Sequence, residues 1–121
     1  MTKILIIEDE IKLLETLSEL LSLGKYEVVA AKNGLEGLEK VTQTNPDLII
    51  CDIMMPILDG YGFLKRLKQS NHHNIPVLFL TAKTELADQQ RGIDLGAKAY
   101  ILKPFSFQEL NLVIEKHLLD K

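Results

Sequence analysis

The chain has 121 residues, of which 46% are hydrophobic and 26% are charged, and its formal net charge is −3. These values are typical of one globular domain, and the lack of a basic stretch argues against direct binding of nucleic acid. The single cysteine, Cys51, excludes an internal disulfide, and no segment has the apolar length of a signal peptide or membrane span, so we expect a cytoplasmic protein.

Five short segments have the composition of β-strands. Unbroken apolar runs bounded by polar or turn residues are typical of strands that are covered on both faces, as in a parallel sheet. In chain order the expected strands are residues 3–7, 26–31, 48–51, 77–80 and 99–102, of which the second is the weakest candidate.

Apolar residues at helical spacing fill the intervals between these strands. Two helix starts have the pattern of a capping box, in which a polar N-cap residue precedes glutamate by three positions: Asn33 with Glu36, and Ser106 with Glu109. A further helix is expected over residues 85–95. The residues expected to hold the helices on the core are Ile11, Leu14, Leu17 and Leu21; Leu35, Leu38 and Val41; Phe63, Leu64 and Leu67; and Leu110, Val113, Ile114 and His117.

This alternation predicts an α/β fold with a parallel sheet, right-handed crossovers and helices on both faces. We expect five strands in the flavodoxin-like order 2-1-3-4-5, in a single domain over residues 1–121. The carboxyl ends of the strands then share one edge, which is where ligands bind in sheets of this kind.

Four of the five expected strands place polar residues at this edge. Glu8 and Asp9 follow the first strand, Asp52 the third, Thr81 the fourth and Lys103 the fifth. Clustered carboxylates repel one another unless protons or a cation neutralise them, and hard oxygen ligands favour Mg²⁺. A carboxylate can also accept a phosphoryl group, whose oxygens lysine and threonine can bind. These residues therefore predict a metal-assisted phosphoryl acceptor.

Taken together, the motifs resemble the receiver domain of bacterial response regulators. They are Glu8-Asp9, Asp52 followed by Met54-Met55-Pro56 and Asp59-Gly60, Thr81-Ala82, and Lys103-Pro104-Phe105. The resemblance covers essentially the whole chain, and each motif lies at the expected strand end.

The resemblance implies a Mg²⁺ cofactor at this edge. Asp9, Asp52 and the backbone carbonyl of Met54 would bind the ion directly, while Glu8 would act through water. It also implies a cis peptide bond between Lys103 and Pro104, which the residue pair permits.

The resemblance further implies a signalling role in a two-component phosphorelay. Asp52 would accept a phosphoryl group from a sensor histidine kinase or phosphotransfer protein, and Thr81 and Lys103 would contact it. Tyr100 would be the aromatic switch partner of Thr81, although it also fits an ordinary half-buried strand residue. Phosphorylation would alter the face formed by the fourth helix, fifth strand and fifth helix, where an output domain or protein, or a second copy, would bind. We expect no enzymatic activity beyond its own phosphorylation and dephosphorylation.

Other functions remain as alternatives. A flavodoxin-like flavin carrier would share the fold, but Glu8-Asp9-Glu10 would repel the flavin phosphate. A magnesium-dependent phosphatase would often have a second aspartate where Met54 stands.

Lys98-Ala99 replaces the acidic pair that many DNA-binding members use in dimer salt bridges, so that dimer mode is not predicted. The chain ends one helix after Lys103, which fits either a single-domain regulator or the receiver of a longer protein.

Overall fold

A computed structural model describes residues 1–83 and 85–119, so Thr84 and the last two residues of the predicted domain lie outside the described residues. Within the described residues, five strands alternate with five helices. In chain order the elements are β1 (Thr2–Ile7), α1 (Ile11–Leu23), β2 (Tyr26–Ala31), α2 (Gly34–Thr44), β3 (Leu48–Cys51), α3 (Gly60–Lys68), β4 (Val77–Thr81), α4 (Leu86–Asp94), β5 (Ala99–Leu102) and α5 (Phe107–Leu119).

The strands form one parallel sheet in the predicted order β2-β1-β3-β4-β5. Ile7 at the end of β1 pairs with Cys51 at the end of β3, and Cys51 pairs in turn with Phe79 of β4. Thr81 pairs with Leu102, which ends β5. Because the strands run in the same direction with these registers, the residues that follow them meet at one edge of the sheet.

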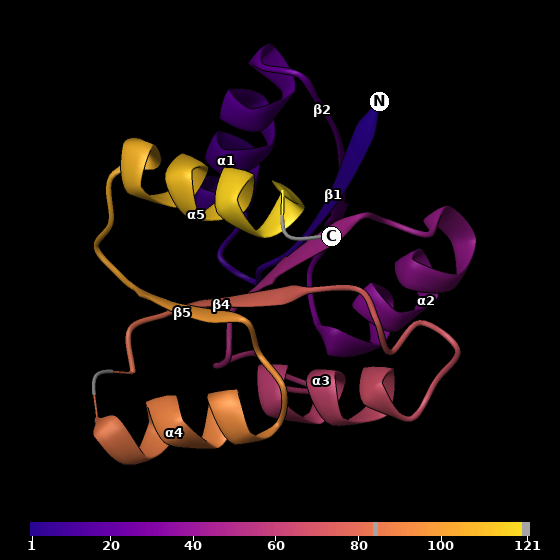
Figure 1. Cartoon of the computed structure of the whole chain (residues 1–121), viewed down its shortest axis with the longest axis vertical. Helices are drawn as coiled ribbons and strands as arrows, with labels where there is room; N and C mark the ends of the chain where they lie inside the picture. The colour runs from indigo at the N-terminus through magenta and orange to yellow at the C-terminus, as the bar shows by residue number, and fades with distance from the viewer. Residues whose placement is uncertain (84, 120–121) are drawn as a thin grey trace.

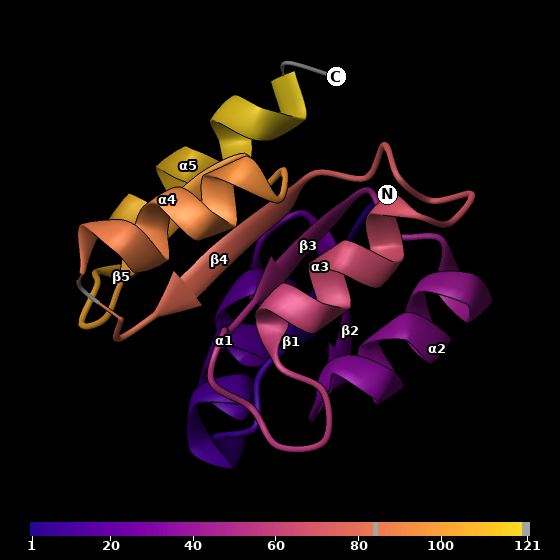
Figure 2. The same ribbon diagram turned by 90° about the horizontal axis from the view of Figure 1, so that it is seen from below.

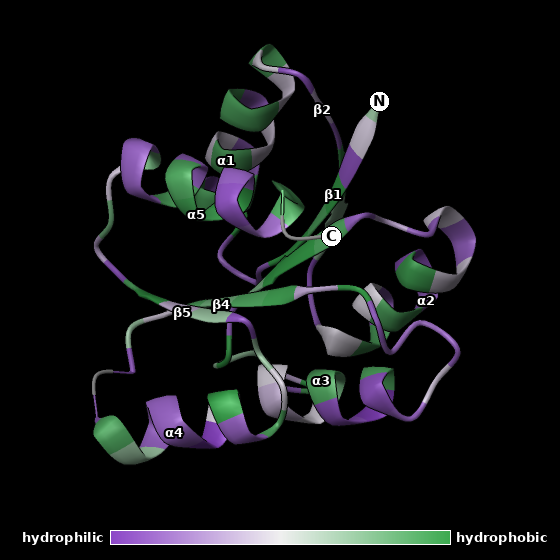
Figure 3. Cartoon of the chain, viewed as in Figure 1, coloured by the Kyte–Doolittle hydropathy of each residue, from purple (hydrophilic) through white to green (hydrophobic). Residues whose placement is uncertain are grey.

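Helices cover both faces of the sheet. Figure 1 shows α1 and α5 on one side and α2, α3 and α4 on the other, which Figure 2 presents nearest the viewer. Each side has its own buried cluster, one including Leu17 and Leu110 and the other including Leu64 and Phe79. The strands are mostly hydrophobic, whereas the helices combine hydrophobic and hydrophilic residues (Figure 3). No helix in the part of the chain described is long and apolar enough to cross a membrane.

The predicted strands agree with the observed ones to within one residue, and α4 is one residue shorter at each end than predicted. Both predicted N-caps are confirmed. The backbone N–H of Glu36 donates to Asn33 Oδ1 at 2.9 Å, and that of Glu109 donates to Ser106 Oγ at 3.0 Å. These bonds satisfy donors that a helix start otherwise leaves unpaired.

The prediction that Leu35 and Ile11 face the core is wrong. Leu35 is 41% exposed because α2 turns Gly37 toward the sheet and Gly34 toward Leu58 of the loop between β3 and α3 instead. A Cβ at Gly37 would lie only 2.5 Å from Ile7 Cδ1, so glycine at this position allows an approach that a leucine would prevent. Ile11 is 47% exposed because it lies in the first turn of α1, before Leu14, which is the first residue of that helix to be buried.

The core face of α5 is narrower than predicted. Leu110 and Ile114 are fully buried, and Val113 packs at the edge of the same cluster. His117 is half-buried, and its Nδ1 lies 2.9 Å from the carbonyl oxygen of Val113. The contact within the helix supports a structural role for His117.

The loop between β3 and α3 has a defined shape. Ile57 has a φ of 73°, a left-handed conformation that β-branched residues rarely adopt. The N–H of Leu58 donates to the carbonyl of Pro56 at 2.8 Å, and the N–H of Gly34 donates to the carbonyl of Leu58 at 3.1 Å. These bonds tie the loop to the start of α2 and hold the segment that follows Asp52.

Candidate functional site

Glu8, Asp9 and Asp52 lie together at the carboxyl edge of the sheet, as predicted. One carboxylate oxygen from each lies within 4.8 Å of the others. Glu8 and Asp52 are only 1% and 6% exposed, whereas Asp9 is exposed to solvent. The adjacent ends of β1 and β3 therefore build a group of oxygen atoms that is buried on one side and open on the other.

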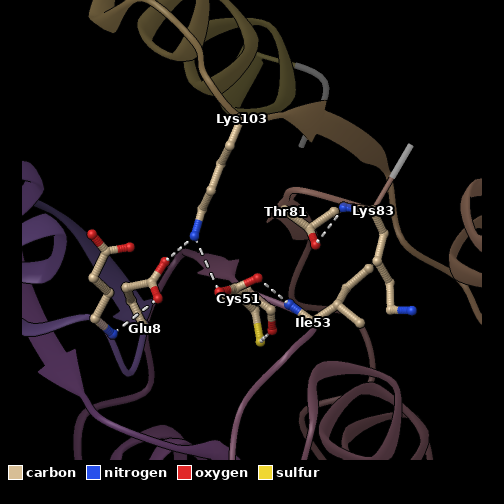
Figure 4. A network of polar contacts seen from close by, with 8 residues as sticks. Glu8, Cys51, Ile53, Thr81, Lys83 and Lys103 are labelled. Carbon is tan, nitrogen blue, oxygen red and sulfur yellow. Dashed lines mark hydrogen bonds and ion pairs between the residues drawn. The ribbon is translucent and has the colours of Figure 1, made fainter.

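Lys103 approaches the two buried carboxylates from the end of β5 (Figure 4). Its Nζ lies 2.9 Å from Glu8 Oε1 and 3.1 Å from Asp52 Oδ2. Burial alone would lower the pKa of Lys103, but the two carboxylates outweigh it and raise that pKa. The predicted cis peptide bond between Lys103 and Pro104 is present. The ammonium group thus partly neutralises the carboxylates.

Backbone groups fix the carboxylates in place. The N–H of Ile53 donates to Asp52 Oδ1 at 2.7 Å, and the N–H of Glu10 donates to Glu8 Oε2 at 3.1 Å. Burial raises the pKa of Glu8 to about 7, although the bonds from Lys103 and Glu10 act in the opposite direction. The protonation of Glu8 is therefore sensitive to the positive charge that lies beside it.

Thr81 and Tyr100 meet at the segment that follows β4. Thr81 is fully buried, and its hydroxyl oxygen accepts a bond from the N–H of Lys83 at 3.3 Å. The Tyr100 hydroxyl donates to the carbonyl of Lys83 at 3.0 Å, so the half-buried ring is turned in beneath this segment. Both predicted switch residues therefore bond to the backbone of Lys83, Thr81 to its N–H and Tyr100 to its carbonyl. Their role as a switch stays a prediction.

A cavity of about 430 Å³ opens beside the carboxylates. Its lining residues are Asp9, Ile53, Met54, Met55, Pro56, Asp59 and Lys83. The Met54 side chain is exposed, and the predicted use of its carbonyl as a ligand stays a prediction. The cavity opens the edge of the sheet to solvent at Asp9 and at Ile53, the residue that follows Asp52.

The donor set fits magnesium better than softer metals. It consists of carboxylate oxygens from Glu8, Asp9 and Asp52, which are hard ligands, and it has no histidine or thiolate. One carboxylate is exposed, which leaves room for the waters that Mg²⁺ usually keeps.

Sequence reasoning did not single out Tyr61, the second residue of α3. The structure buries this residue against the aromatic rings near Thr81. An aromatic residue directly after Asp59-Gly60 was the available signal, but helical spacing alone assigns it to the core.

Comparison with known proteins identifies the family. The model of the response regulator receiver domain matches residues 4–115. The transcriptional regulatory protein PcoR of Escherichia coli is 44% identical over 110 residues, which cover 91% of this chain and 48% of PcoR. The alkaline phosphatase synthesis transcriptional regulatory protein PhoP of Bacillus subtilis (strain 168) is 42% identical over 109 residues, covering 90% of this chain and 45% of PhoP.

The chain thus spans about half the length of the curated relatives it matches. Among solved structures, the receiver domain of the Francisella response regulator 1452 superimposes with a TM-score of 0.93 at 30% identity, covering 99% of this chain and 98% of that one. The sequence match and the structural match cover the same single domain, including the strand ends that carry the acidic residues and the lysine. The chain belongs to the response regulator receiver domain family.

Proposed function

We propose that this receiver domain is switched by phosphorylation of Asp52. The observation that carries the proposal is the placement of Asp52, whose buried carboxylate faces the Lys103 ammonium at 3.1 Å beside a cavity open to solvent. Glu8 and Asp9 supply further carboxylates for a cation at the same point.

The transfer needs few groups from the protein. A carboxylate oxygen of Asp52 attacks the phosphorus of a phosphohistidine, and the bond from phosphorus to the imidazole nitrogen breaks. The departing nitrogen keeps the electron pair, and because the other ring nitrogen carries a proton the ring leaves as neutral imidazole, while the new acyl phosphate stays on Asp52. Lys103 lies where it can stabilise the negative charge of the phosphoryl oxygens. Attack by water on the phosphorus later breaks its bond to the Asp52 oxygen, which releases inorganic phosphate and restores the carboxylate. The chain thus catalyses only its own phosphorylation and dephosphorylation.

Magnesium fits the carboxylates that surround this reaction. Asp9, Asp52 and the Met54 carbonyl would hold the ion, with Glu8 acting through water. When bound, the ion would offset the negative charge of the acidic residues and of the approaching phosphoryl group.

The signal leaves through the face formed by α4, β5 and α5. A phosphoryl group adds about −1.5 to −2 charges and three acceptor oxygens at Asp52. The Thr81 hydroxyl lies at the end of the adjacent strand and can donate to one of them by moving toward it. Tyr100 shares the Lys83 backbone with Thr81, so such a movement changes its surroundings.

The proposed partners follow from this role. A sensor histidine kinase or phosphotransfer protein supplies the phosphoryl group, and an output domain or protein, or a second copy, binds the altered face. The two relatives named as transcriptional regulatory proteins support an output in gene control, and a cytoplasmic location suits both partners.

Phosphorylation by a small donor tests the proposal. With Mg²⁺ and acetyl phosphate, the wild-type protein should gain one hydroxylamine-labile phosphoryl group by intact-mass measurement, and chelation of Mg²⁺ should prevent it. Asp52→Asn should gain none, whereas the control Asp94→Asn, on the exposed surface of α4, should be labelled like the wild type. Labelling of Asp52→Asn at the wild-type level would overturn the assignment.

A further inference from the structure

Helix α4 is attached to the rest of the domain by few contacts. Gly92 is its only buried residue, whereas each of the other four helices buries at least two. A Cβ at Gly92 would lie 3.0 Å from Phe79 Cδ2 and 3.5 Å from Tyr100 Cδ2, so the helix backbone rests directly on these rings. The position of α4 therefore depends on a small number of aromatic and polar contacts.

Three aromatic rings form the surface on which α4 rests. Tyr61 of α3 meets Phe79 edge to face, with ring centroids 5.8 Å apart, and Phe79 meets Tyr100 in the same manner at 6.4 Å. Figures 1 and 2 show α3 and α4 on the same face of the sheet. The Tyr61 ring thus links α3 to the residues beneath α4.

The Tyr61 side chain also contacts α4 directly. Its hydroxyl donates to the backbone carbonyl of Asp88 at 3.0 Å, in the first turn of the helix. The guanidinium carbon of Arg91 lies 4.2 Å from the Tyr61 ring centroid, which is the geometry of a cation–π contact. Burial raises the pKa of Tyr100, and the neighbouring Tyr61 acts in the same direction.

The backbone next to Tyr61 is fixed to the phosphoryl acceptor. The N–H of Gly60 donates to the carbonyl of Ile53 at 2.8 Å. A Cβ at Gly60 would overlap the carbonyl oxygen of Asp52, so the start of α3 packs directly on the acceptor residue. Tyr61 follows immediately, and its ring extends from this fixed point to α4 and Tyr100.

We propose that Tyr61 is a positioning residue that couples the position of Tyr100 and of the first turn of α4 to the occupancy of Asp52. The proposal rests on the function proposed above. It adds a connection from Asp52 to α4 through the start of α3, beside the connection through Thr81. By linkage, a substitution that alters these contacts unequally in the free and occupied states also alters the affinity of Asp52 for a phosphoryl group or its mimic.

Removal of one hydroxyl group tests the proposal. Tyr61→Phe keeps the ring and removes the hydroxyl that bonds to Asp88, so it should change the affinity for beryllofluoride with Mg²⁺ by about two- to tenfold. Heteronuclear NMR should also show smaller shifts of the Asp88 to Gly92 amides on binding. Tyr26→Phe is the matched control, because the Tyr26 hydroxyl has no hydrogen-bond partner in the part of the chain described; its affinity should equal that of the wild type.

A double variant separates this role from a general loss of stability. If Tyr61 acts through Tyr100, the combined change of affinity in Tyr61→Phe with Tyr100→Phe should be smaller than the product of the single changes. Affinity and α4 shifts of Tyr61→Phe equal to those of the wild type would overturn the proposal.

A measurement without ligand keeps the two proposals distinguishable. Amide hydrogen exchange at Asp88 and Gly92 should be faster in ligand-free Tyr61→Phe than in the wild type and in Tyr26→Phe. Equal exchange rates would refute the positioning role even if beryllofluoride failed to bind the wild-type protein. Failure of the wild type to bind it would itself contradict phosphorylation at Asp52.

Discussion

Lys103 should contribute strongly to the free energy of unfolding of the metal-free protein. Its ammonium group lies 2.9 Å from Glu8 and 3.1 Å from Asp52, and both carboxylates are almost fully buried. Lys103→Met keeps much of the length of the side chain and removes its charge. The variant must therefore hold two buried carboxylates without the cation that lies between them.

The expected loss in the free energy of unfolding of Lys103→Met follows from the burial of the two ion pairs that Lys103 makes. Removing one partner of a buried ion pair costs about 3–5 kcal/mol, and because Lys103 keeps some exposure we expect about 3 kcal/mol at pH 8. For a domain of this size, that corresponds to a fall of roughly 10 °C in the melting temperature. Mg²⁺ should restore more stability to the variant than to the wild type, since the ion supplies the missing positive charge.

The loss should depend on pH in a definite direction. The pKa of Glu8 is about 7 in the fold against an ordinary value of 4.5, so between these pH values the folded protein binds more protons than the unfolded chain. Wild-type stability without metal should consequently fall as pH rises through this interval. At pH 5.5 Glu8 is mostly protonated, and Lys103→Met should then cost about half as much as at pH 8.

Urea denaturation in the presence of a chelator, followed by circular dichroism at both pH values, measures these differences. Lys12→Met, at an exposed position of α1, is the control and should change the free energy of unfolding by less than about 0.5 kcal/mol. A loss in Lys103→Met below about 1 kcal/mol at pH 8, or one that does not change with pH, would refute this account of the site.

The same geometry leads to three shorter predictions. Metal-free Asp9→Ala should melt at an equal or higher temperature than the wild type, because one of three close carboxylates is removed; a clearly lower value would make Asp9 a structural acceptor. Gly60→Ala should lower the free energy of unfolding in urea by about 1–3 kcal/mol, since its methyl group would overlap the Asp52 carbonyl, and an unchanged midpoint would contradict that packing. Thr81→Ala should still bind beryllofluoride but lose most of the NMR shifts around Tyr100. Full wild-type shifts there would show that the coupling does not pass through Thr81.

Most of the fold could be predicted from the sequence because its three central strands, β1, β3 and β4, contain unbroken apolar runs. Such runs have one favourable environment, a sheet covered on both faces, and their ends locate Glu8, Asp52 and Thr81 without further information. The helix faces were less predictable. Leu35 has the spacing of a core residue, but the inward side of α2 is set by how closely Gly37 lets the helix approach the sheet.

The remainder of the site depends on distances that no local pattern contains. Lys103 was assigned to the correct edge, yet its simultaneous contact with Glu8 and Asp52 depends on the reach of a side chain from β5 to the ends of β1 and β3. Tyr61 has the sequence signature of an ordinary core aromatic residue. Its bond to the Asp88 carbonyl joins residues 27 positions apart and exists only through the packing of α3 beside α4.

Because α4 buries so little of itself, its outward face can change in sequence more freely than the faces of the other helices. Because Gly92 is the only residue that the helix buries, its outward positions, such as Leu86 and Ile93, contribute little to the free energy of unfolding. Substitutions there should therefore cost little in folding. If the face that includes α4 binds the output partner as proposed, the residues that choose the partner differ from those that maintain the fold, so related chains could acquire new partners while keeping the same carboxylate site.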